Sequence, residues 1–566
     1  MKTLTKFAWI FPLLALGTVS KAQLINNFYH SDVKGPADHG QGDKVITAVP
    51  SDDYPERTYV VAGASRLSLK GESPSVSLSR YALDGTTLYH RTFVINSADA
   101  GDFTSVKGLV EVTSPAASGF AILAYTNTAT TQSVLIRTGE HGHLIWKREV
   151  GFREAASLAY DKVRDRLLVL TRVGEDATAD LQLVVVDAKS GVVIYTRHLD
   201  GFRGSDDEPS TVLYDPHTQD YLLTGTTKIT FPASVQSRLM LVRLDNNGKL
   251  VYTRVIGDEA EQLTAVSATI IPAGPASRVV IGGSVTGLVE NNAYTNQPAY
   301  TTVDIATGKL AGLHVIQKQF DLKALTFEPL SGDLDIVGNK DLAGKGIQSN
   351  LFSIDPANPA GIGSDHVFNK EPSTSAFNDI APGPGTHVVM TGYHQFPVLW
   401  AGSPPNLNYP WLTTADAEGT GACEVSADVQ VVRTRLPHLS SASISSAFLS
   451  SEVDVREESQ DELVLNGCDL DFRLIAPAGS AGAAQFKFYP NPASSVINVE
   501  YTTASNAEVI LSLIDVTGRV VLNQRLAAGE HMTGTVNLSD YASGVYYSDL
   551  KVNGQSVTKE KIAVQH

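Results

Sequence analysis

Residues 239–254 read LMLVRLDNNGKLVYTR, two apolar strands joined by a turn that contains Asp245 and Gly248. Related hairpins occupy residues 78–91, 134–148 and 183–197, and weaker copies turn near Gly308 and Gly361. Turns with Asp and Gly supply the positive φ angles that tight hairpins require. The second strand often ends in Tyr/Trp-x-Arg, so the hairpin is a repeated structural unit.

A second element precedes each hairpin, a short apolar strand that usually closes on glycine. It occurs at residues 59–63, 120–124, 166–170, 221–225, 279–282, 334–338 and 387–392. Another short strand stands ahead of it, as at residues 157–160 and 211–214. The unit therefore holds four short strands, and it recurs some seven times with a period of about 50 to 60 residues.

This repeat predicts an all-β fold. A four-stranded unit of this length cannot bury both faces alone, whereas radial stacking of such units buries them and leaves only short edges. We expect a β-propeller over residues 23–415, with seven blades, or with six or eight if the repeat ends elsewhere. A β-solenoid is the alternative, but its period is normally much shorter.

The beginning of the chain has the pattern of a secretory signal. Lys2 and Lys6 precede the apolar run of residues 7–19, and small residues stand at the expected cleavage site after Ala22. The run is about 13 residues long, and a membrane span needs roughly 20. We therefore expect residues 1–22 to be a signal peptide and the mature chain to have no transmembrane segment.

The charge balance bears on the class of partner. The formal net charge is -16, and only 18% of the residues are charged. Binding to nucleic acid or to an anionic membrane surface requires a basic patch that releases counterions. The composition therefore argues against nucleic acid as a partner.

Residues 416–477 form an extension in which the repeat has stopped. Strand-like runs at residues 428–435 and 462–465 flank a Ser-rich stretch, residues 440–451. The only cysteines of the sequence are Cys423 and Cys468. An isolated pair in an exported protein predicts a disulfide, and two buried thiols are the alternative. Residues 478–485 are a linker of small residues.

The C-terminal residues, 486–566, change pattern again. Six or seven strands with alternating polarity follow one another in about 80 residues, which predicts a small β-sandwich. Four ordered motifs resemble the type A sorting domain of the type IX secretion system. They are Tyr489, Pro490, Asn491 and Pro492; Asp515, Gly518 and Arg519; Gly544 and Tyr546; and Lys559 and Lys561.

The resemblance implies a route of export. A sorting domain of this kind is recognised by the type IX machinery after transport into the periplasm. A surface sortase then removes it, which releases the protein or attaches it to lipopolysaccharide. The alternative interpretation is an ordinary terminal sandwich that binds a ligand.

Several residue groups are candidates for chemistry, and each has a structural interpretation. Residues 245–248 resemble the start of a calcium loop, yet Lys249 stands where an oxygen ligand belongs. The carboxylates of residues 206–208 are expected on a solvated loop, and His141 and His143 on an exposed turn. The Tyr/Trp-x-Arg strand ends indicate outer-strand packing, although aromatic rings on one rim could also stack on sugars.

Two functional hypotheses follow from this sequence. In the first, the propeller is a non-catalytic interaction or adhesion module that binds glycan or protein through the loops of one face. In the second, it is an extracellular polysaccharide-degrading enzyme whose carboxylates meet in the central funnel. We assign no catalytic residue, metal ligand or cofactor from the sequence.

Overall fold

The computed structural model divides into two compact units, Met1–Leu474 and Ile475–His566. The predicted signal peptide, Cys423, Cys468, the linker, Pro492, Gly518 and Arg519 lie outside the residues it describes. The described residues are 26–31, 39–66, 74–95, 104–114, 118–126, 132–151, 155–174, 179–200, 205–231, 234–257, 261–289, 292–342, 346–357, 362–384, 388–396, 407–416, 424–434, 438–439, 443–445, 455–459, 462–466, 487–491, 493–501, 509–515, 520–527, 532–539, 541–552 and 555–565.

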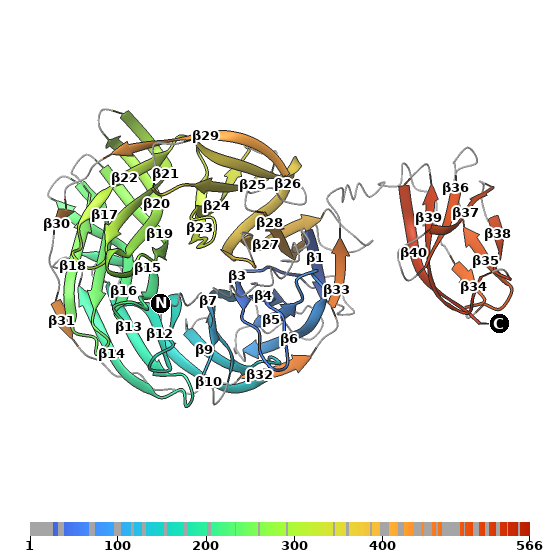
Figure 1. Cartoon of the computed structure of the whole chain (residues 1–566), viewed down its shortest axis with the longest axis horizontal. Coiled ribbons are helices and arrows are strands. Elements are labelled where there is room, and N and C mark those ends of the chain that lie inside the picture. The colour runs from blue at the N-terminus through green and yellow to red at the C-terminus, as the bar shows by residue number, and fades with distance from the viewer. Residues whose placement is uncertain are drawn as a thin grey trace, which may run out of the picture. The chain divides into compact units, whose positions relative to one another are not determined.

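Antiparallel groups of four strands build the first unit, and they follow one another round a ring (Figure 1). We number the groups as blades and give their strands from the inside outward. Blade 1 has β3 (Lys44–Ala48), β4 (Thr58–Arg66), β5 (Pro74–Tyr81) and β6 (Thr87–Ile95); blade 2 has β7 (Thr104–Val112), β8 (Gly119–Thr126), β9 (Gln132–Gly139) and β10 (Leu144–Gly151); blade 3 has β11 (Ala155–Asp161), β12 (Arg166–Val173), β13 (Asp180–Asp187) and β14 (Val193–Asp200).

The remaining groups continue the same order. Blade 4 has β15 (Asp206–Tyr214), β16 (Tyr221–Phe231), β17 (Ser234–Leu244) and β18 (Leu250–Ile256); blade 5 has β19 (Glu261–Ile271), β20 (Arg278–Val289), β21 (Asn292–Asp304) and β22 (Leu310–Ile316); blade 6 has β23 (Asp321–Phe327), β24 (Leu334–Asp341), β25 (Ile347–Ile354) and the first half of β26 (Ile362–Pro382); blade 7 has the second half of β26, β27 (Val388–Phe396), β28 (Leu407–Ala415) and β1 (Asn26–Ser31). The short strand β2 (His39–Gly40) pairs with β4, and η1 (Gly274–Ala276) is a 3-10 turn.

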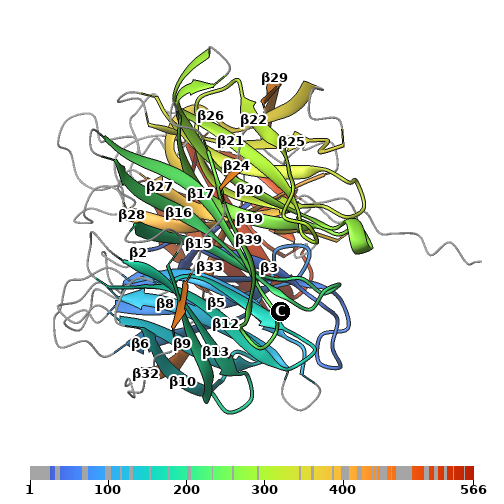
Figure 2. The same ribbon diagram turned by 90° about the vertical axis from the view of Figure 1, so that its left-hand side faces the viewer.

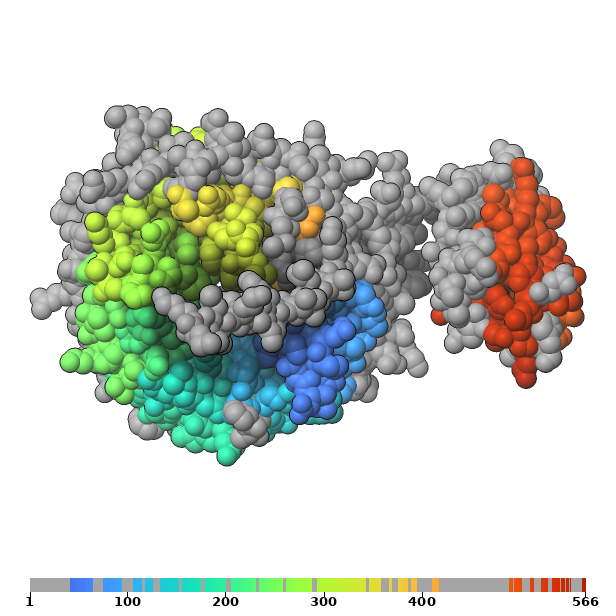
Figure 3. Space-filling model, viewed as in Figure 1, coloured from blue at the N-terminus to red at the C-terminus, as the bar shows by residue number. Residues whose placement is uncertain are grey.

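The two ends of this ring meet in blade 7. Strand β1 pairs with β28, so the beginning of the described chain completes the last blade. The colours in Figure 3 pass from blue through green to yellow around the visible face, so consecutive blades are neighbours. These findings confirm the prediction of an all-β propeller.

The hydrophobic core is divided among the interfaces between blades. Val60 and Phe93 of blade 1 share a buried cluster with Phe120 and Ile136 of blade 2. The cluster that contains Val45 and Tyr59 of blade 1 also contains Val389 and Leu412 of blade 7, and it closes the ring. Strands such as β12 and β13 read as continuous apolar runs because both of their faces are covered.

An irregularity of the inner strands explains why the repeat carries glycine. In blades 4 to 7 the pairing between the first two strands skips a residue of the inner strand, opposite or next to a glycine. Such a β-bulge bends the strand. A Cβ on Gly283 would lie 1.7 Å from the carbonyl oxygen of Thr264, and a Cβ on Gly392 would lie 1.9 Å from that of Ala376. Glycine is present because backbone occupies the place of a side chain.

The described strands between residues 424 and 466 lie on the outside of the propeller. The strands of this segment are β29 (Glu424–Thr434), β30 (His438–Leu439), β31 (Ser443–Ser445), β32 (Val455–Ser459) and β33 (Glu462–Asn466). They add a further strand to blades 6, 5, 4, 3, 1 and 7, in that order. Figure 1 shows them at the outer rim, and we call the strands β29 to β33 the belt.

The second unit has two antiparallel sheets around one core. One sheet has β34 (Lys487–Tyr489), β35 (Val496–Tyr501) and β38 (Met532–Asn537). The other has β37 (Val520–Leu526), β36 (Val509–Asp515), β39 (Gly544–Val552) and β40 (Gln555–Val564). Val499 and Val536 from the first sheet and Leu511, Leu550 and Ile562 from the second belong to the same buried cluster.

Candidate functional site

The aromatic-x-Arg strand ends bind the neighbouring blade. The Tyr195 hydroxyl lies 3.4 Å from the Asn246 carbonyl oxygen, and Arg197 Nε donates to the Gly248 carbonyl oxygen at 3.2 Å. The Arg197 guanidinium also lies 4.6 Å from the centre of the Tyr195 ring, within the range of a cation–π contact. Ring and guanidinium together cover the hairpin turn of the next blade.

The same contact recurs at other interfaces. Arg254 Nε donates to the Gly308 carbonyl oxygen at 3.2 Å, and Trp146 Nε1 donates to the Ala188 carbonyl oxygen at 3.1 Å. We call each such pair of side chains a clasp. The turn glycines have positive φ, so their backbone approaches the clasp without a Cβ in the way. These rings and guanidinium groups hold blades together.

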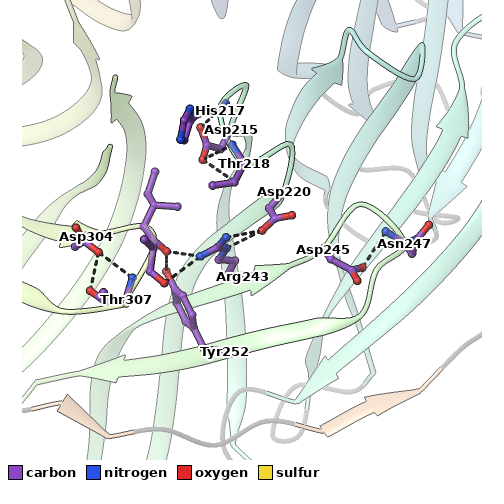
Figure 4. Close-up of polar contacts among 12 residues, drawn as sticks. Asp215, His217, Thr218, Asp220, Arg243, Asp245, Asn247, Tyr252, Asp304 and Thr307 are labelled. Atoms are coloured by element: carbon purple, nitrogen blue, oxygen red, sulfur yellow. Dashed lines mark hydrogen bonds and ion pairs between the residues drawn. The ribbon is translucent and has the colours of Figure 1, made fainter. Parts of the chain in front are cut away.

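Arg243 adds a buried ion pair to the interface between blades 4 and 5. Its guanidinium donates to Asp220 Oδ2 from Nε at 2.8 Å, and the Nη2–Oδ2 separation is 2.7 Å. Nη1 donates to the Ile305 carbonyl oxygen at 2.8 Å, which also accepts the Tyr252 hydroxyl at 2.9 Å (Figure 4). Burial raises the pKa of Asp220, and Arg243 opposes that shift.

The aspartates of the repeat stabilise their own turns. Asp215 accepts from the backbone N–H groups of His217 and Thr218, and Asp304 from that of Thr307 at 2.8 Å (Figure 4). Asp245 Oδ1 accepts from the N–H groups of Asn247 and Lys249, each at 2.9 Å. Such Asx turns use the carboxylate oxygens that a cation would need. No group of three or more potential metal ligands occurs among the described residues.

The carboxylates of residues 206–208 do not form the solvated loop that we expected. They begin the innermost strand of blade 4, β15. Asp206 pairs with Arg172 and with Lys228, whose Nζ is 3.3 Å from Asp206 Oδ2 and 3.2 Å from Glu208 Oε2. These cations could not be predicted from the neighbouring residues because they come from other strands.

His141 lies on an exposed turn, as expected. Its Nε2 is 3.0 Å from Asp53 Oδ2, and its Nδ1 is 3.0 Å from the Tyr54 hydroxyl. Both ring nitrogens thus contact the turn of blade 1. This histidine belongs to the contact between blades 1 and 2.

Two aspartates also join blades: Asp43, just before β3, and Asp379, in the second half of β26. Asp43 accepts from the backbone N–H of Val106 in blade 2 at 2.8 Å, and Asp379 of blade 7 accepts from that of Val45 in blade 1 at 3.0 Å. Burial raises the pKa of Asp43 to about 6, against the opposing effect of its hydrogen bonds. Raised carboxyl pKa values also occur in catalytic sites, but these two carboxylates are held by the backbone of the adjoining blade.

Asp335 of β24 is expected to make stability depend on pH. Burial raises its pKa to about 7, and Ser353 donates a hydrogen bond to it. The folded chain therefore binds this proton more tightly than the unfolded chain, and stability falls as pH rises from about 4 to 8. We expect Asp335→Asn to stabilise the propeller by up to about 4 kcal/mol at pH 8 and to have little effect near pH 4.

Tryptophan-detected urea unfolding at the two pH values measures this effect, since residues 486–566 contain no tryptophan. Asp321→Asn, at an exposed carboxylate, is the matched control. An Asp335→Asn gain that is equal at both pH values would contradict the expectation.

The hairpin between β20 and β21 carries a different kind of surface. Its turn lies at the other end of β21 from the turn that the Arg254 clasp covers. Both strands are longer than the corresponding strands β8, β9, β12 and β13, and the side view shows the comparably long β16 and β17 of blade 4 (Figure 2). The pairing skips residues near Thr286 and Asn296, and Asn296 has a φ of 47°. The hairpin is therefore bent where it leaves the body of the blade.

Neutral amide and hydroxyl groups gather on this hairpin and on the connection that follows β22. Gln317 Nε2 donates to the Tyr294 hydroxyl at 3.3 Å, and Gln319 Nε2 to the Thr295 carbonyl oxygen at 3.3 Å. Gln297 Nε2 donates to the Ile316 carbonyl oxygen at 2.7 Å. We call this group the amide platform: Tyr294, Thr295, Asn296, Gln297, Gln317 and Gln319. Sequence reasoning missed it, and the polar run of residues 290–297 was the available signal.

The sorting motifs lie in the second unit, at the two ends of its chain and on its middle strands. The Asn491 side chain accepts from the backbone N–H of Ala563 at 2.9 Å, next to the last strand. The Tyr489 hydroxyl donates to Glu500 Oε1 at 2.5 Å. Asp515 is opposite Tyr546, whose hydroxyl donates to the Ala542 carbonyl oxygen at 2.9 Å.

The two basic motif residues and the remaining motif glycine lie in paired strands. Lys559 and Lys561 of β40 are opposite Asp549 and Tyr547, and Gly544 begins β39 opposite Val564. The first motif, at Tyr489 and Asn491, and the last, at Lys559 and Lys561, therefore lie on adjoining segments of the second unit.

Comparisons with known proteins give different results for the two units. Residues 487–565 match the family described as secretion system C-terminal sorting domain. No curated protein matches the chain. Solved structures with similar architecture include the β-propeller domain of the Trilobed protease from Pyrococcus furiosus, at 11% identity over 66% of this chain and 93% of that chain, with a TM-score of 0.37. Sqt1 from Chaetomium thermophilum matches at 10% identity over 72% of this chain and 100% of that one, with a TM-score of 0.36.

The helix content adds one fact about membranes. Among the described residues, none lies in a helix long and apolar enough to cross a bilayer. The sorting domain indicates delivery to the cell surface or to the medium. The chain is therefore an exported protein of the type IX secretion pathway, with its C-terminal sorting domain at residues 487–565 behind a β-propeller.

Proposed function

We propose that the propeller is a non-catalytic interaction module that binds a neutral, hydroxyl-rich glycan through the amide platform. The observation that carries this proposal is the gathering of glutamine, asparagine and tyrosine side chains on one projecting hairpin. Amide groups offer both donors and acceptors, and a tyrosine offers an apolar ring with a polar tip. These groups match sugar hydroxyls without requiring charge on the ligand.

The hydrogen-bond partners of the carboxylates support a binding role over hydrolysis. Glycoside hydrolysis uses two carboxyl groups placed on either side of the scissile bond. Asp43 and Asp379 instead accept hydrogen bonds from the backbone of neighbouring blades, and Asp215, Asp245 and Asp304 from their own turns. The clasps likewise use the aromatic rings that could otherwise have stacked on sugars.

A binding and degradation screen of the full chain tests the proposal. The probes are dextran, xylan, mannan and β-glucan, with alginate as an anionic comparison. We expect retardation by at least one neutral polymer in affinity electrophoresis, without release of reducing ends. The variant Asn296→Ala/Gln317→Ala/Gln319→Ala should weaken this binding about tenfold or more, because a lost hydrogen bond contributes about 1 kcal/mol.

Lys189→Ala, on an exposed turn of blade 3, is the control and should bind normally. Binding that survives the triple substitution would place the ligand elsewhere. Release of reducing ends would favour the alternative function, an extracellular polysaccharide-degrading enzyme, and retention on none of the neutral polymers would contradict a neutral glycan as the ligand.

A further inference from the structure

The first two strands of blade 5 carry a second group of neutral polar side chains, beside the bulge. The group consists of Gln262 and Thr264 of β19 and their partners across the pairing, Thr286 and Ser284 of β20. Gln262, Thr264 and Thr286 are exposed, and the hydroxyl oxygens of Thr264 and Ser284 lie 2.7 Å apart. We call this group the inner patch. It offers amide and hydroxyl groups that both donate and accept hydrogen bonds, and it carries no charge.

The inner patch lies on the face of the sheet that is directed toward blade 6. Leu263 and Val285 alternate with its residues and belong to the buried cluster shared with blade 4. Further along β20 the face of the inner patch is covered, since a Cβ on Gly282 would meet the side chain of Leu325 in blade 6. Strand β20 has 12 residues, whereas β24 of blade 6 has 8. The exposed end of this face is therefore the part that extends beyond the contact with blade 6.

Blade 4 has charged side chains at the corresponding places. Counted from the bulge in each blade, three of its residues correspond to three of the inner patch: Asp206 to Gln262, Glu208 to Thr264 and Lys228 to Thr286. The charged residues form ion pairs, in which Lys228 Nζ lies 3.2 Å from Glu208 Oε2. The backbone thus accepts charges at these positions, and their neutrality in blade 5 does not follow from the fold.

The inner patch is continuous with the amide platform. The backbone N–H of Asn296 donates to Thr286 Oγ1 at 2.9 Å. At its inner end stands Val266, the extra residue of the bulge, which is 40% exposed. The four residues from Gln262 to Val266 span about 13 Å, and the three strands β19 to β21 span about 10 Å across the sheet. One sugar ring does not cover such a surface, whereas a chain of several does.

We propose that the inner patch is a second part of the glycan site, and that the ligand is a linear neutral polysaccharide bound over several sugar units. The amide platform holds one part of the chain, and the inner patch holds the units that follow it toward the inner side of the blade. Val266 offers an apolar contact for the face of a sugar ring. This inference rests on the proposed function, because it assigns the extent of the same site and the form of its ligand.

Isothermal titration calorimetry of the full chain with oligosaccharides of two lengths tests the inference. The probes are isomalto-, xylo-, manno- and β-gluco-oligosaccharides of three and of six sugar units. In at least one series we expect the longer oligosaccharide to bind about tenfold or more tightly than the shorter one, through the added hydrogen bonds. Gln262→Ala/Thr264→Ala should remove this advantage and leave the affinity for the shorter oligosaccharide unchanged.

Glu208→Ala, at the place in blade 4 that corresponds to Thr264, is the matched control and should bind both lengths normally. Equal affinity for the two lengths would overturn the inference and leave the proposed function standing. A double variant that keeps the advantage of the longer oligosaccharide would also overturn it. Binding of neither length in any series would contradict the proposed function itself, and the inference with it.

Discussion

Gly283→Ala is expected to destabilise the propeller by about 4 kcal/mol or more, a loss at the upper end of single substitutions. The added Cβ would lie 1.7 Å from the carbonyl oxygen of Thr264, which is backbone of the neighbouring strand and cannot rotate away. Relief requires β19 to move, and β19 carries the bulge that pairs with Gly283 and Gly282. Tryptophan-detected unfolding in urea measures the loss.

Ser284→Ala is the matched control for this substitution. Ser284 is the next residue of β20, and its hydroxyl makes an exposed hydrogen bond with Thr264. Its removal should cost no more than about 1 kcal/mol. An equal loss for the two variants would show that the inner-strand bulge does not need glycine.

Arg243→Ala is expected to cost about 3 to 5 kcal/mol, the usual effect of removing one partner of a buried ion pair. The substitution leaves Asp220, which is 8% exposed, without its counter-charge. It also removes the donor to the Ile305 carbonyl oxygen across the interface between blades 4 and 5. Burial already raises the pKa of Asp220, so the loss should be larger at pH 8 than at pH 4.

Two further variants separate charge from packing at this position. Asp220→Asn/Arg243→Ala should recover part of the loss at pH 8, because the buried negative charge is gone. Lys323→Ala breaks an exposed pair with Asp321 and should change stability by less than about 1 kcal/mol. A double variant that is less stable than Arg243→Ala at pH 8 would contradict an electrostatic origin.

Much of the propeller could be predicted because its signals are local. The hairpin turn at residues 245–248 needs an aspartate that accepts from its own backbone and a glycine with positive φ, and both requirements act within five residues. The same holds for the apolar strands, whose covered faces show directly in the sequence. A repeat of such signals predicts a repeat of strands.

The partners of the repeated side chains could not be predicted. The Tyr/Trp-x-Arg motif was visible, but its target is a turn about 50 residues further along the chain, as in the contacts of Arg197 with Asn247 and Gly248. The glycine at the end of the second strand was visible as well, and the carbonyl that excludes its side chain comes from the bulged inner strand. The repeat in the sequence identifies the motif and the glycine, but not the contacts that each of them makes.

The belt is the clearest case of dependence on tertiary structure. Its short strands β30 and β31 lie just before and within the Ser-rich stretch, which has little apolar periodicity. Their hydrogen bonds come from the outer edges of blades rather than from a local hairpin. The sequence by itself determined the repeated four-stranded unit, the acidic composition and the sorting motifs. The tertiary structure alone decided which blades meet, how β1 completes blade 7, which outer strands the belt pairs with, and where neutral polar groups gather. Those features join residues far apart in the chain, and only the folded backbone brings them within hydrogen-bonding distance.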